Sequence, residues 1–291
     1  MSTLPLRQLL RDEFPALLAE IPQPPKTLWA EGNLPPSDLA LLAVVGSRQY
    51  TTYGKQAVEQ LIGGLAGYPI GIVSGLALGI DALAHEAALK AGLYTLAVPG
   101  SGLGERVIYP ATNRRLARRI IDAGGGLLSE LAPDTQAAQW TFPQRNRIMA
   151  GICRATLLIE AGEKSGTLIT ARMAVDYNRE LLVVPGSIFS PTSRGCHQFL
   201  RLGATPVTSA ADILDALNIE PTSTESKVAA ESDLSPEAIL VLTHLREPTD
   251  RDTLITRLDL PTAAANIVLM QVELEGHIDA EGGIYTPLTH L

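Results

Sequence analysis

The sequence predicts an α/β protein, an extended Rossmann-like parallel sheet with a small C-terminal winged-helix domain. Six strand-length apolar runs alternate with segments of helical periodicity, which is the pattern of βαβ units. These runs are apolar throughout and do not alternate with polar residues, as expected for a sheet buried on both faces. A Ser-, Thr- and Glu-rich stretch then separates them from a second set of shorter elements.

The predicted elements follow in order along the chain. Residues 1–25 are expected to form an N-terminal helical remnant, an apolar helix followed by a proline-rich turn. The Rossmann-like domain is expected over residues 26–217, and a further short helix in it starts near Asn146. Its strands are predicted at 41–45, 70–73, 94–98, 126–128, 156–159 and 181–184, and its main helices at 53–66, 81–91, 113–122 and 168–177.

The C-terminal part of the chain has a different pattern. Residues 218–234 are predicted to be a linker, and residues 235–291 a winged-helix-like domain. The latter shows three short helical segments, followed by a hairpin around Glu281-Gly282-Gly283. The helices are predicted at 236–246, 252–258 and 262–274, and the hairpin at 277–287.

Length and composition exclude several classes of protein. The chain has 291 residues, enough for about two domains, and it is 46% hydrophobic and 19% charged. Its longest apolar runs are strand-sized and its first residues lack a secretory signal, so we expect a cytoplasmic protein without membrane insertion. The two cysteines, Cys153 and Cys196, have no metal-ligand spacing and are predicted to be buried, reduced thiols.

The net charge of −8 is unevenly distributed. Residues 1–211 hold 19 basic and 16 acidic residues, whereas residues 212–291 hold 4 and 15, a net charge of −11. The basic residues also cluster, which indicates either a phosphate-binding surface or a solvated helix face. One cluster is Arg106, Arg114, Arg115, Arg118 and Arg119, and the other is Arg145, Arg147, Arg154 and Lys164.

The loops that follow the predicted strands share one chemistry. Ligands of an open parallel sheet bind beyond the carboxyl ends of its strands. Glycine there permits close backbone approach, and helix N-termini present free N–H groups to anions. The loops predict an anion-binding edge, through Gly46-Ser47-Arg48, Ser74-Gly75, Gly100-Ser101-Gly102, Ser129-Glu130, Lys164-Ser165-Gly166-Thr167 and Gly186-Ser187.

The fifth of these loops resembles the Gly-Thr loop of lysine-decarboxylase-like phosphoribohydrolases. Those enzymes carry a glutamate three residues after the threonine, where this chain has Thr170. The acid is absent while Lys164 is available to a phosphate, which favours holding phosphates over cleaving a glycosidic bond. The loop is not a P-loop, because GxxxxGK[ST] does not occur.

Residues 142–150 combine an aromatic ring, two arginines and an asparagine just before a predicted helix. Phe142 is suited to stacking on a base, and Arg145 or Arg147 to a bidentate phosphate contact. Alternatively, the arginines tie the helix to the sheet through Glu130 or Glu160. Because aromatic residues are only 4% of the chain, we expect no long base-stacking track, and binding that rests mainly on backbone phosphates with little sequence preference.

A catalytic constellation is not evident in the sequence. Asp81 and His85 are four residues apart on a predicted helix and resemble an acid/base pair. The favoured interpretation is that Asp81 caps the helix and His85 packs locally. No Ser/His/Asp order, HExxH motif or paired carboxylates stand out, so we expect no enzyme and no cofactor.

Taken together and in order, these motifs resemble the DNA processing protein A family (DprA/Smf) over residues 25–215. The resemblance implies a single-stranded DNA-binding protein that protects incoming DNA, helps load RecA in natural transformation and forms homodimers. The motifs are VVGSRQYTTYG (44–54), IVSGLALGIDALAHEAAL (72–89), VIYPATN (107–113), LLSE (127–130), FPQRNRIMAGI (142–152), LIEAGEKSGTLITARMA (158–174) and VVPGS (183–187).

Mapped by motif, the family's DNA contacts fall on residues of three loops of this chain. The alternative function is a Rossmann-type nucleotide-processing enzyme that uses the same edge, and a third is a protein scaffold with an acidic module. The implied DNA contacts are Gly46, Ser47, Arg48, Phe142, Arg145, Asn146, Arg147, Lys164, Ser165 and Gly166.

Overall fold

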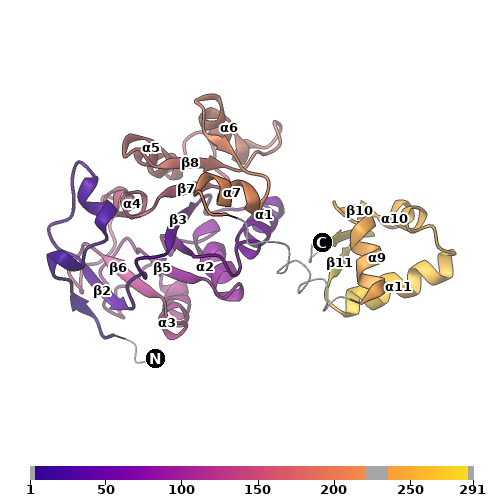
Figure 1. The fold of residues 1–291 in the computed structure, drawn as a ribbon, viewed down its shortest axis with the longest axis horizontal. Helices are drawn as coiled ribbons and strands as arrows, with labels where there is room; N and C mark the ends of the chain where they lie inside the picture. Colours follow the sequence, from indigo (N-terminus) through magenta and orange to yellow (C-terminus); the bar gives the residue numbers. More distant parts are fainter. Residues whose placement is uncertain (1–3, 221–234, 288–291) are drawn as a thin grey trace. The chain divides into compact units, whose positions relative to one another are not determined.

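The structure, a computed structural model, describes residues 4–220 and 235–287 and divides the chain into two units (Figure 1). The units are Met1–Pro221 and Thr222–Leu291, and each is described by itself below. Most of the predicted linker, residues 221–234, lies outside the described residues.

One nine-stranded sheet organises the first unit, in the order β1-β2-β6-β5-β4-β3-β7-β8-β9. The seven strands from β3 to β9 are mutually parallel, which confirms the predicted parallel sheet. Strand β2 is antiparallel to β6, and the edge strand β1 is antiparallel to β2, so β1 runs in the same direction as the seven parallel strands. The strands are β1 (Arg7–Gln8), β2 (Trp29–Gly32), β3 (Ala40–Val45), β4 (Ile70–Ser74), β5 (Tyr94–Ala97), β6 (Gly126–Ser129), β7 (Ala155–Leu158), β8 (Glu180–Val183) and β9 (Thr205–Pro206).

Helices cover both faces of this sheet, so the unit has three layers (Figure 1). Strand β3 shows why its run is continuously apolar: Leu42 and Val44 pack under α1, α2 and α7, and Ala43 and Val45 under α4, α5 and α6. Helix α3 packs beside α2 on the first face. The helices are α1 (Thr52–Gly63), α2 (Ile80–Lys90), α3 (Arg114–Asp122), α4 (Thr141–Ile152), α5 (Thr167–Asp176), α6 (Arg194–Arg201) and α7 (Ala210–Ala216).

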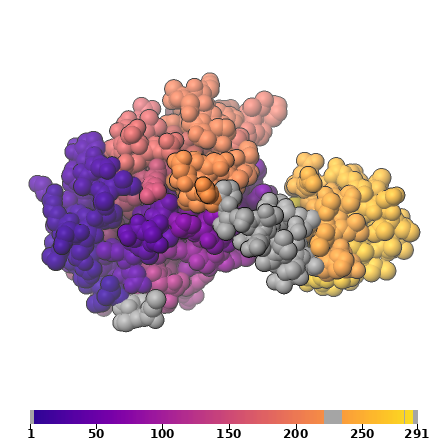
Figure 2. All heavy atoms as spheres, viewed as in Figure 1, coloured from indigo at the N-terminus to yellow at the C-terminus, as the bar shows by residue number. Residues whose placement is uncertain are grey.

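The N-terminal segment differs from its prediction. In place of an apolar α-helix it forms the short strand β1 and two 3₁₀ helices, η1 (Arg11–Glu13) and η2 (Ala16–Glu20). Prolines 5, 15, 22, 24 and 25 punctuate this stretch, and a proline inside an α-helix removes a hydrogen bond. The segment still belongs to the body, because Leu18 and Ile21 are buried in its core, and in Figure 2 its atoms (indigo) form one end of that body.

The second unit has the predicted three helices and hairpin. The turn between the hairpin strands is Gly282-Gly283, with both glycines at positive φ, and a third short strand completes a small sheet. Buried side chains of all three helices form its core, Leu242, Leu254 and Leu269 among them. The elements are α9 (Pro236–His244), β10 (Thr249–Asp250), α10 (Arg251–Leu258), α11 (Thr262–Leu274), β11 (Ile278–Glu281) and β12 (Ile284–Pro287).

His85 is a buried titratable group under the sheet. Its side chain in α2 is fully buried, and its Nδ1 lies 2.8 Å from the Thr95 hydroxyl. Burial lowers its pKa to about 3, well below the value of about 6.5 in an unfolded chain. Between these two values the unfolded chain binds one proton more than the folded protein, so this group makes stability fall as the pH falls.

We expect the free energy of unfolding to drop by about 2 kcal/mol between pH 7 and pH 5 on account of His85. Urea unfolding at the two pH values measures the drop, and the His85→Gln variant, which has no proton to gain there, should show a correspondingly smaller one. An equal pH dependence in both proteins would contradict this origin.

Candidate nucleic-acid interface

A pocket of about 500 Å³ opens at the carboxyl edge of the parallel sheet. Its walls come from the loops after β3, β4 and β7 and from the first turns of α4 and α5. Strand order reverses between β3 and β7, since the chain leaves β6 on one side of β3 and resumes with β7 on the other. The pocket therefore lies at the topological switch point, where open α/β sheets bind their ligands.

One face of α4 forms a wall of the pocket. The helix begins at Thr141, five residues earlier than predicted. Pro143 is compatible with this start, because it lies in the first turn, where its missing N–H would have no intrahelical partner. Phe142, Arg145, Asn146 and Met149 all line the pocket. Their spacing of i, i+3, i+4 and i+7 places them on one side of a helix.

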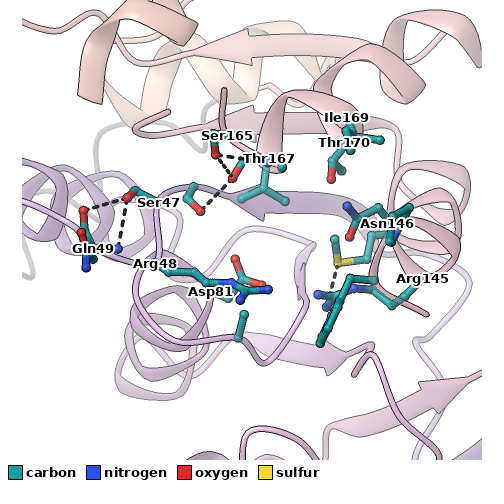
Figure 3. Close-up of a pocket in the computed structure, with 17 residues that line it drawn as sticks. Ser47, Arg48, Gln49, Asp81, Arg145, Asn146, Ser165, Thr167, Ile169 and Thr170 are labelled. Atoms are coloured by element: carbon teal, nitrogen blue, oxygen red, sulfur yellow. Dashed lines mark hydrogen bonds between the residues drawn. The ribbon is translucent and has the colours of Figure 1, made fainter. Parts of the chain in front are cut away.

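Arg145 and Asp81 form the charged floor of the pocket (Figure 3). Both side chains are more than nine-tenths buried, and the Arg145 Nη1 donates to the Val98 carbonyl at 2.5 Å. Burial raises the pKa of Asp81, and the Arg145 charge opposes that rise. The Nε of Arg145 has no hydrogen-bond partner, so the guanidinium retains a donor. Gly75 makes room for it: a Cβ there would lie 1.6 Å from Nη1.

Arg48 is the exposed cation at the mouth of the pocket. It lies in the loop after β3, and its Cζ is 5.3 Å from the centre of the Phe142 ring. This loop is pressed against the start of α2, where the Ile80 amide donates to the Ser47 carbonyl. Gly79 permits that approach, because it has φ +83° and a Cβ there would lie 2.3 Å from the Ser47 oxygen. Arg48 thus combines an exposed charge, which also acts on the Asp81 carboxyl, with a neighbouring aromatic face.

The first turn of α5 closes the pocket on the other side. Its N-cap residue, Gly166, has no capping side chain, and the Thr167 hydroxyl donates to the Gly46 carbonyl at 3.0 Å (Figure 3). Within this turn the Thr167 amide donates to the Ser165 hydroxyl, and the Leu168 and Ile169 amides donate to the Ser165 and Gly166 carbonyls. Thr170 is buried and lines the pocket, so the position of the phosphoribohydrolase glutamate faces this site without a carboxylate.

Eight of the ten residues predicted to contact DNA line the pocket, all but Arg147 and Lys164. Arg147 is buried and forms an ion pair with Glu130 and a hydrogen bond to the Gln23 carbonyl, which fits the alternative role of tying α4 to its surroundings. Residues 145 and 147 are two apart on a helix and face different directions. Lys164 is exposed on the loop that carries Ser165.

The two basic clusters of the sequence do not form one surface. Arg154 precedes β7 and lies at the opposite, amino edge of the sheet. On α3, Arg118 is 3.6 Å from Glu31, and Arg119 is 2.6 Å from Glu86. These contacts match the alternative of a solvated helix face.

Nine lining residues were not predicted as site residues. With the helix start placed at Thr141, the spacing of four residues between Arg145 and Met149 would have predicted that Met149 shares the face of Arg145. The burial of Asp81 has no sequence signal, because an aspartate in a first helical turn normally remains in solvent. The others are Val45, Gln49, Ala77, Pro143, Thr167, Ile169 and Thr170.

The catalytic interpretation of Asp81 and His85 finds no geometric support. The prediction that Asp81 caps α2 is wrong: its carboxylate accepts a hydrogen bond from the Gly75 amide and so stabilises the preceding loop. His85 bonds to Thr95 in the core. Cys153 and Cys196 are free and buried, as predicted. Within residues 4–220 and 235–287 no cluster of three or more His, Cys, Asp or Glu side chains is arranged to hold a metal ion, and no helix is long and apolar enough to cross a membrane.

Comparison with known proteins identifies the family of the chain. The model of DNA recombination-mediator protein A matches residues 6–218, and that of the DprA winged helix domain matches residues 224–283. DNA processing protein DprA of Streptococcus pneumoniae is 43% identical over 210 residues, which cover 72% of this chain and 73% of the relative. Protein Smf of Escherichia coli is 35% identical over 282 residues, or 94% and 75%.

Two solved structures share the fold. The X-ray structure of the S. pneumoniae protein covers 75% of each chain with a TM-score of 0.68 and 41% identity. The Helicobacter pylori DNA processing protein A covers 74% of this chain and 96% of that one, with a TM-score of 0.64 and 28% identity. The H. pylori structure concerns a single-stranded DNA binding mode of that protein.

The matches to both family models, one over the Rossmann-like body and one over the winged helix, define the class of the chain as a DNA recombination mediator. The chain belongs to the DNA recombination-mediator protein A family, DprA/Smf. This membership confirms the predicted family and fold class. It also confirms the predicted function of a recombination mediator over the alternative of a nucleotide-processing enzyme.

Proposed function

We propose that this chain binds single-stranded DNA in the pocket at the carboxyl edge, protects incoming strands and helps load the recombinase RecA onto them. The observation that carries the proposal is the convergence of Arg48, Arg145 and the Phe142 ring on one pocket. Cations hold phosphates, and an aromatic face takes an unpaired base. In a duplex the bases are stacked and unavailable to such a ring.

The site residues of the proposal are the eight sequence-predicted residues that line the pocket together with one neighbour. The neighbour is Lys164, which is exposed beside Ser165 and adds a positive charge at the mouth. Arg147 is left out, because Glu130 already neutralises it. The proposed DNA contacts are Gly46, Ser47, Arg48, Phe142, Arg145, Asn146, Lys164, Ser165 and Gly166.

A salt titration tests the proposal. Binding to a single-stranded and a double-stranded oligonucleotide of the same length is measured at several salt concentrations. We expect tighter binding of the single strand, and an affinity that falls steeply with salt because each phosphate contact releases counterions. Equal affinity for the two strands, or base release from nucleoside monophosphates, would favour the alternative of a nucleotide-processing enzyme.

The winged helix is proposed to contact protein instead of DNA. Its candidate recognition helix, α11, contains no Lys or Arg, whereas helices that read the major groove are basic. The region from residue 212 carries a net charge of −11, which repels phosphates within a Debye length of ~8 Å.

Deletion of residues 219–291 is expected to leave the affinity for single-stranded DNA unchanged or to increase it, since it removes only repulsion. Equilibrium binding of the full chain and the truncated chain measures the difference. A loss of about tenfold or more, ~1.4 kcal/mol, would show that the module binds DNA despite its charge.

A homodimer is part of the same proposal, with an apolar interface outside the pocket. An interface of this kind buries at least ~1,000 Å². Light scattering at micromolar concentration is expected to give twice the chain mass of 31.0 kDa, and a monomeric mass would count against the dimer.

A further inference from the structure

The exposed aromatic side chains of the described residues all lie at one edge of the molecule's main sheet. Their exposed fractions range from 44% to 87%, and each ring follows a parallel strand, so all share the carboxyl edge with the pocket. The whole chain has only 2 Trp, 7 Tyr and 4 Phe, and no other ring of the described part is comparably exposed. The five are Tyr50 and Tyr53 after β3, Tyr109 after β5, Trp140 after β6 and Phe189 after β8.

Contacts connect these rings to the pocket on one flank. Tyr109 lies 5.8 Å from Phe142, ring centre to ring centre, at a tilt of 55°, and Phe142 in turn carries Arg48 over its face. Trp140 precedes Phe142 by two residues at the start of α4. Tyr109 and Trp140, which follow β5 and β6, therefore lie next to Phe142, and Phe142 lies next to Arg48 at the mouth of the pocket.

The other flank is organised around Tyr53, in the first turn of α1. Its hydroxyl donates to the Pro185 carbonyl at 2.5 Å, which ties α1 to the loop after β8. That loop carries Phe189 at its tip, with 87% of the side chain exposed. The hydrogen bond to Pro185 fixes the orientation of the Tyr53 ring. Nearly half of the residue nevertheless remains exposed to solvent.

We propose that these exposed rings are base-stacking platforms that extend the path of a single DNA strand along the carboxyl edge, on both sides of the pocket. The proposal rests on the proposed function. Stacking suits every base, and proteins that bind single strands without sequence preference alternate rings with cations. The rings come from four different strand ends and stand beside the cations of the pocket, Arg48 above all, which fits an extended polyanion with unpaired bases.

The positions of the exposed rings revise the prediction made from composition. An aromatic content of 4% by itself predicts no long base-stacking track. The few aromatic residues that are exposed, however, lie together at the carboxyl edge of the sheet. Five exposed rings together with Phe142 are enough for a short track.

The test compares two probes: an oligothymidylate of about 20 nucleotides, and an abasic strand of the same length with the same phosphates but no bases. Three variants remove one ring each while keeping an apolar side chain: Trp140→Leu, Tyr53→Leu and Phe189→Leu. Each is expected to weaken binding of the oligothymidylate about fivefold or more and to leave binding of the abasic strand unchanged.

Conservative variants and a control sharpen the comparison. Tyr53→Phe and Phe189→Trp keep a ring and are expected to bind as the unmodified protein does. Leu202→Ala removes an exposed apolar side chain between α6 and β9, at the amino edge of the sheet, and is expected to change neither probe. A short oligothymidylate of about 5 nucleotides, which fills only the pocket, is expected to be insensitive to Phe189→Leu.

The inference and the proposed function fail in different ways. If the protein binds the oligothymidylate but the leucine variants bind it equally well, the rings are not platforms and the inference is overturned. The same holds if the variants lose the abasic strand to the same extent, since the loss then concerns the phosphates. If the unmodified protein does not bind single strands at all, the proposed function itself fails.

Discussion

Arg48→Glu is expected to weaken binding of single-stranded DNA at low salt by more than about tenfold, ~1.4 kcal/mol. Arg48 is exposed at the mouth of the pocket and sits over the Phe142 ring. The change removes one phosphate contact and places a negative charge where the strand passes. The neutral Arg48→Ala variant should also lower the salt dependence of binding by about one contact.

Arg154→Glu is the matched control for this charge reversal. Arg154 is exposed as well, but it lies just before β7, at the amino edge of the sheet. The net charge changes by the same amount in both variants, so an effect of overall charge would appear in both. Unchanged affinity in Arg48→Glu would remove this residue from the site, and both variants should unfold at the same urea concentration as the parent protein.

Arg145→Met is expected to affect both stability and binding. Arg145 and Asp81 are both buried, and the Arg145 charge favours the ionised form of the Asp81 carboxyl. Without the guanidinium the buried carboxylate loses part of its electrostatic compensation, which we expect to cost about 1–3 kcal/mol of unfolding free energy. Affinity for single-stranded DNA should fall about tenfold, because a cation leaves the floor of the pocket.

A double variant separates the two effects of Arg145. Asp81→Asn removes the carboxylate charge but keeps an oxygen that accepts from the Gly75 amide. Asp81→Asn/Arg145→Met is therefore expected to recover most of the lost stability, as measured by urea unfolding, while its DNA affinity stays low. Recovery of both together would mean that Arg145 acts only through the fold.

Patterns with a local physical cause were predictable from the sequence. Apolar runs predicted the six inner strands to within a residue or two, because a strand buried on both faces has no polar positions. Glycine-rich turns after these strands predicted the pocket, since tight turns at the carboxyl edge need glycine. The resemblance of PKTLWAEGNL (25–34) to the lead-in strand of the family indicates strand β2, but local composition does not specify its antiparallel pairing with β6.

Side-chain direction is the main point on which the sequence-based prediction is wrong. The prediction starts the helix near Asn146, which leaves Phe142 and Arg145 in a preceding loop and gives the two arginines no distinct directions. In the helix, Phe142, Arg145 and Asn146 share a face, while Arg147 points away to Glu130. A proline in the first turn is compatible with a helix, so the helix could have been predicted to start before Pro143. Both arginines then lie in the helix, where residues two apart face different directions.

The most direct test of the central claim is photocrosslinking with a single-stranded oligonucleotide that carries photoreactive bases, followed by mass spectrometry of the crosslinked peptides. The account predicts crosslinks in peptides that contain Arg48 and Phe142, and their loss in Arg48→Glu. Crosslinks confined to the amino edge of the sheet, near Arg154, or to the winged helix, residues 235–287, would contradict binding in the pocket at the switch point.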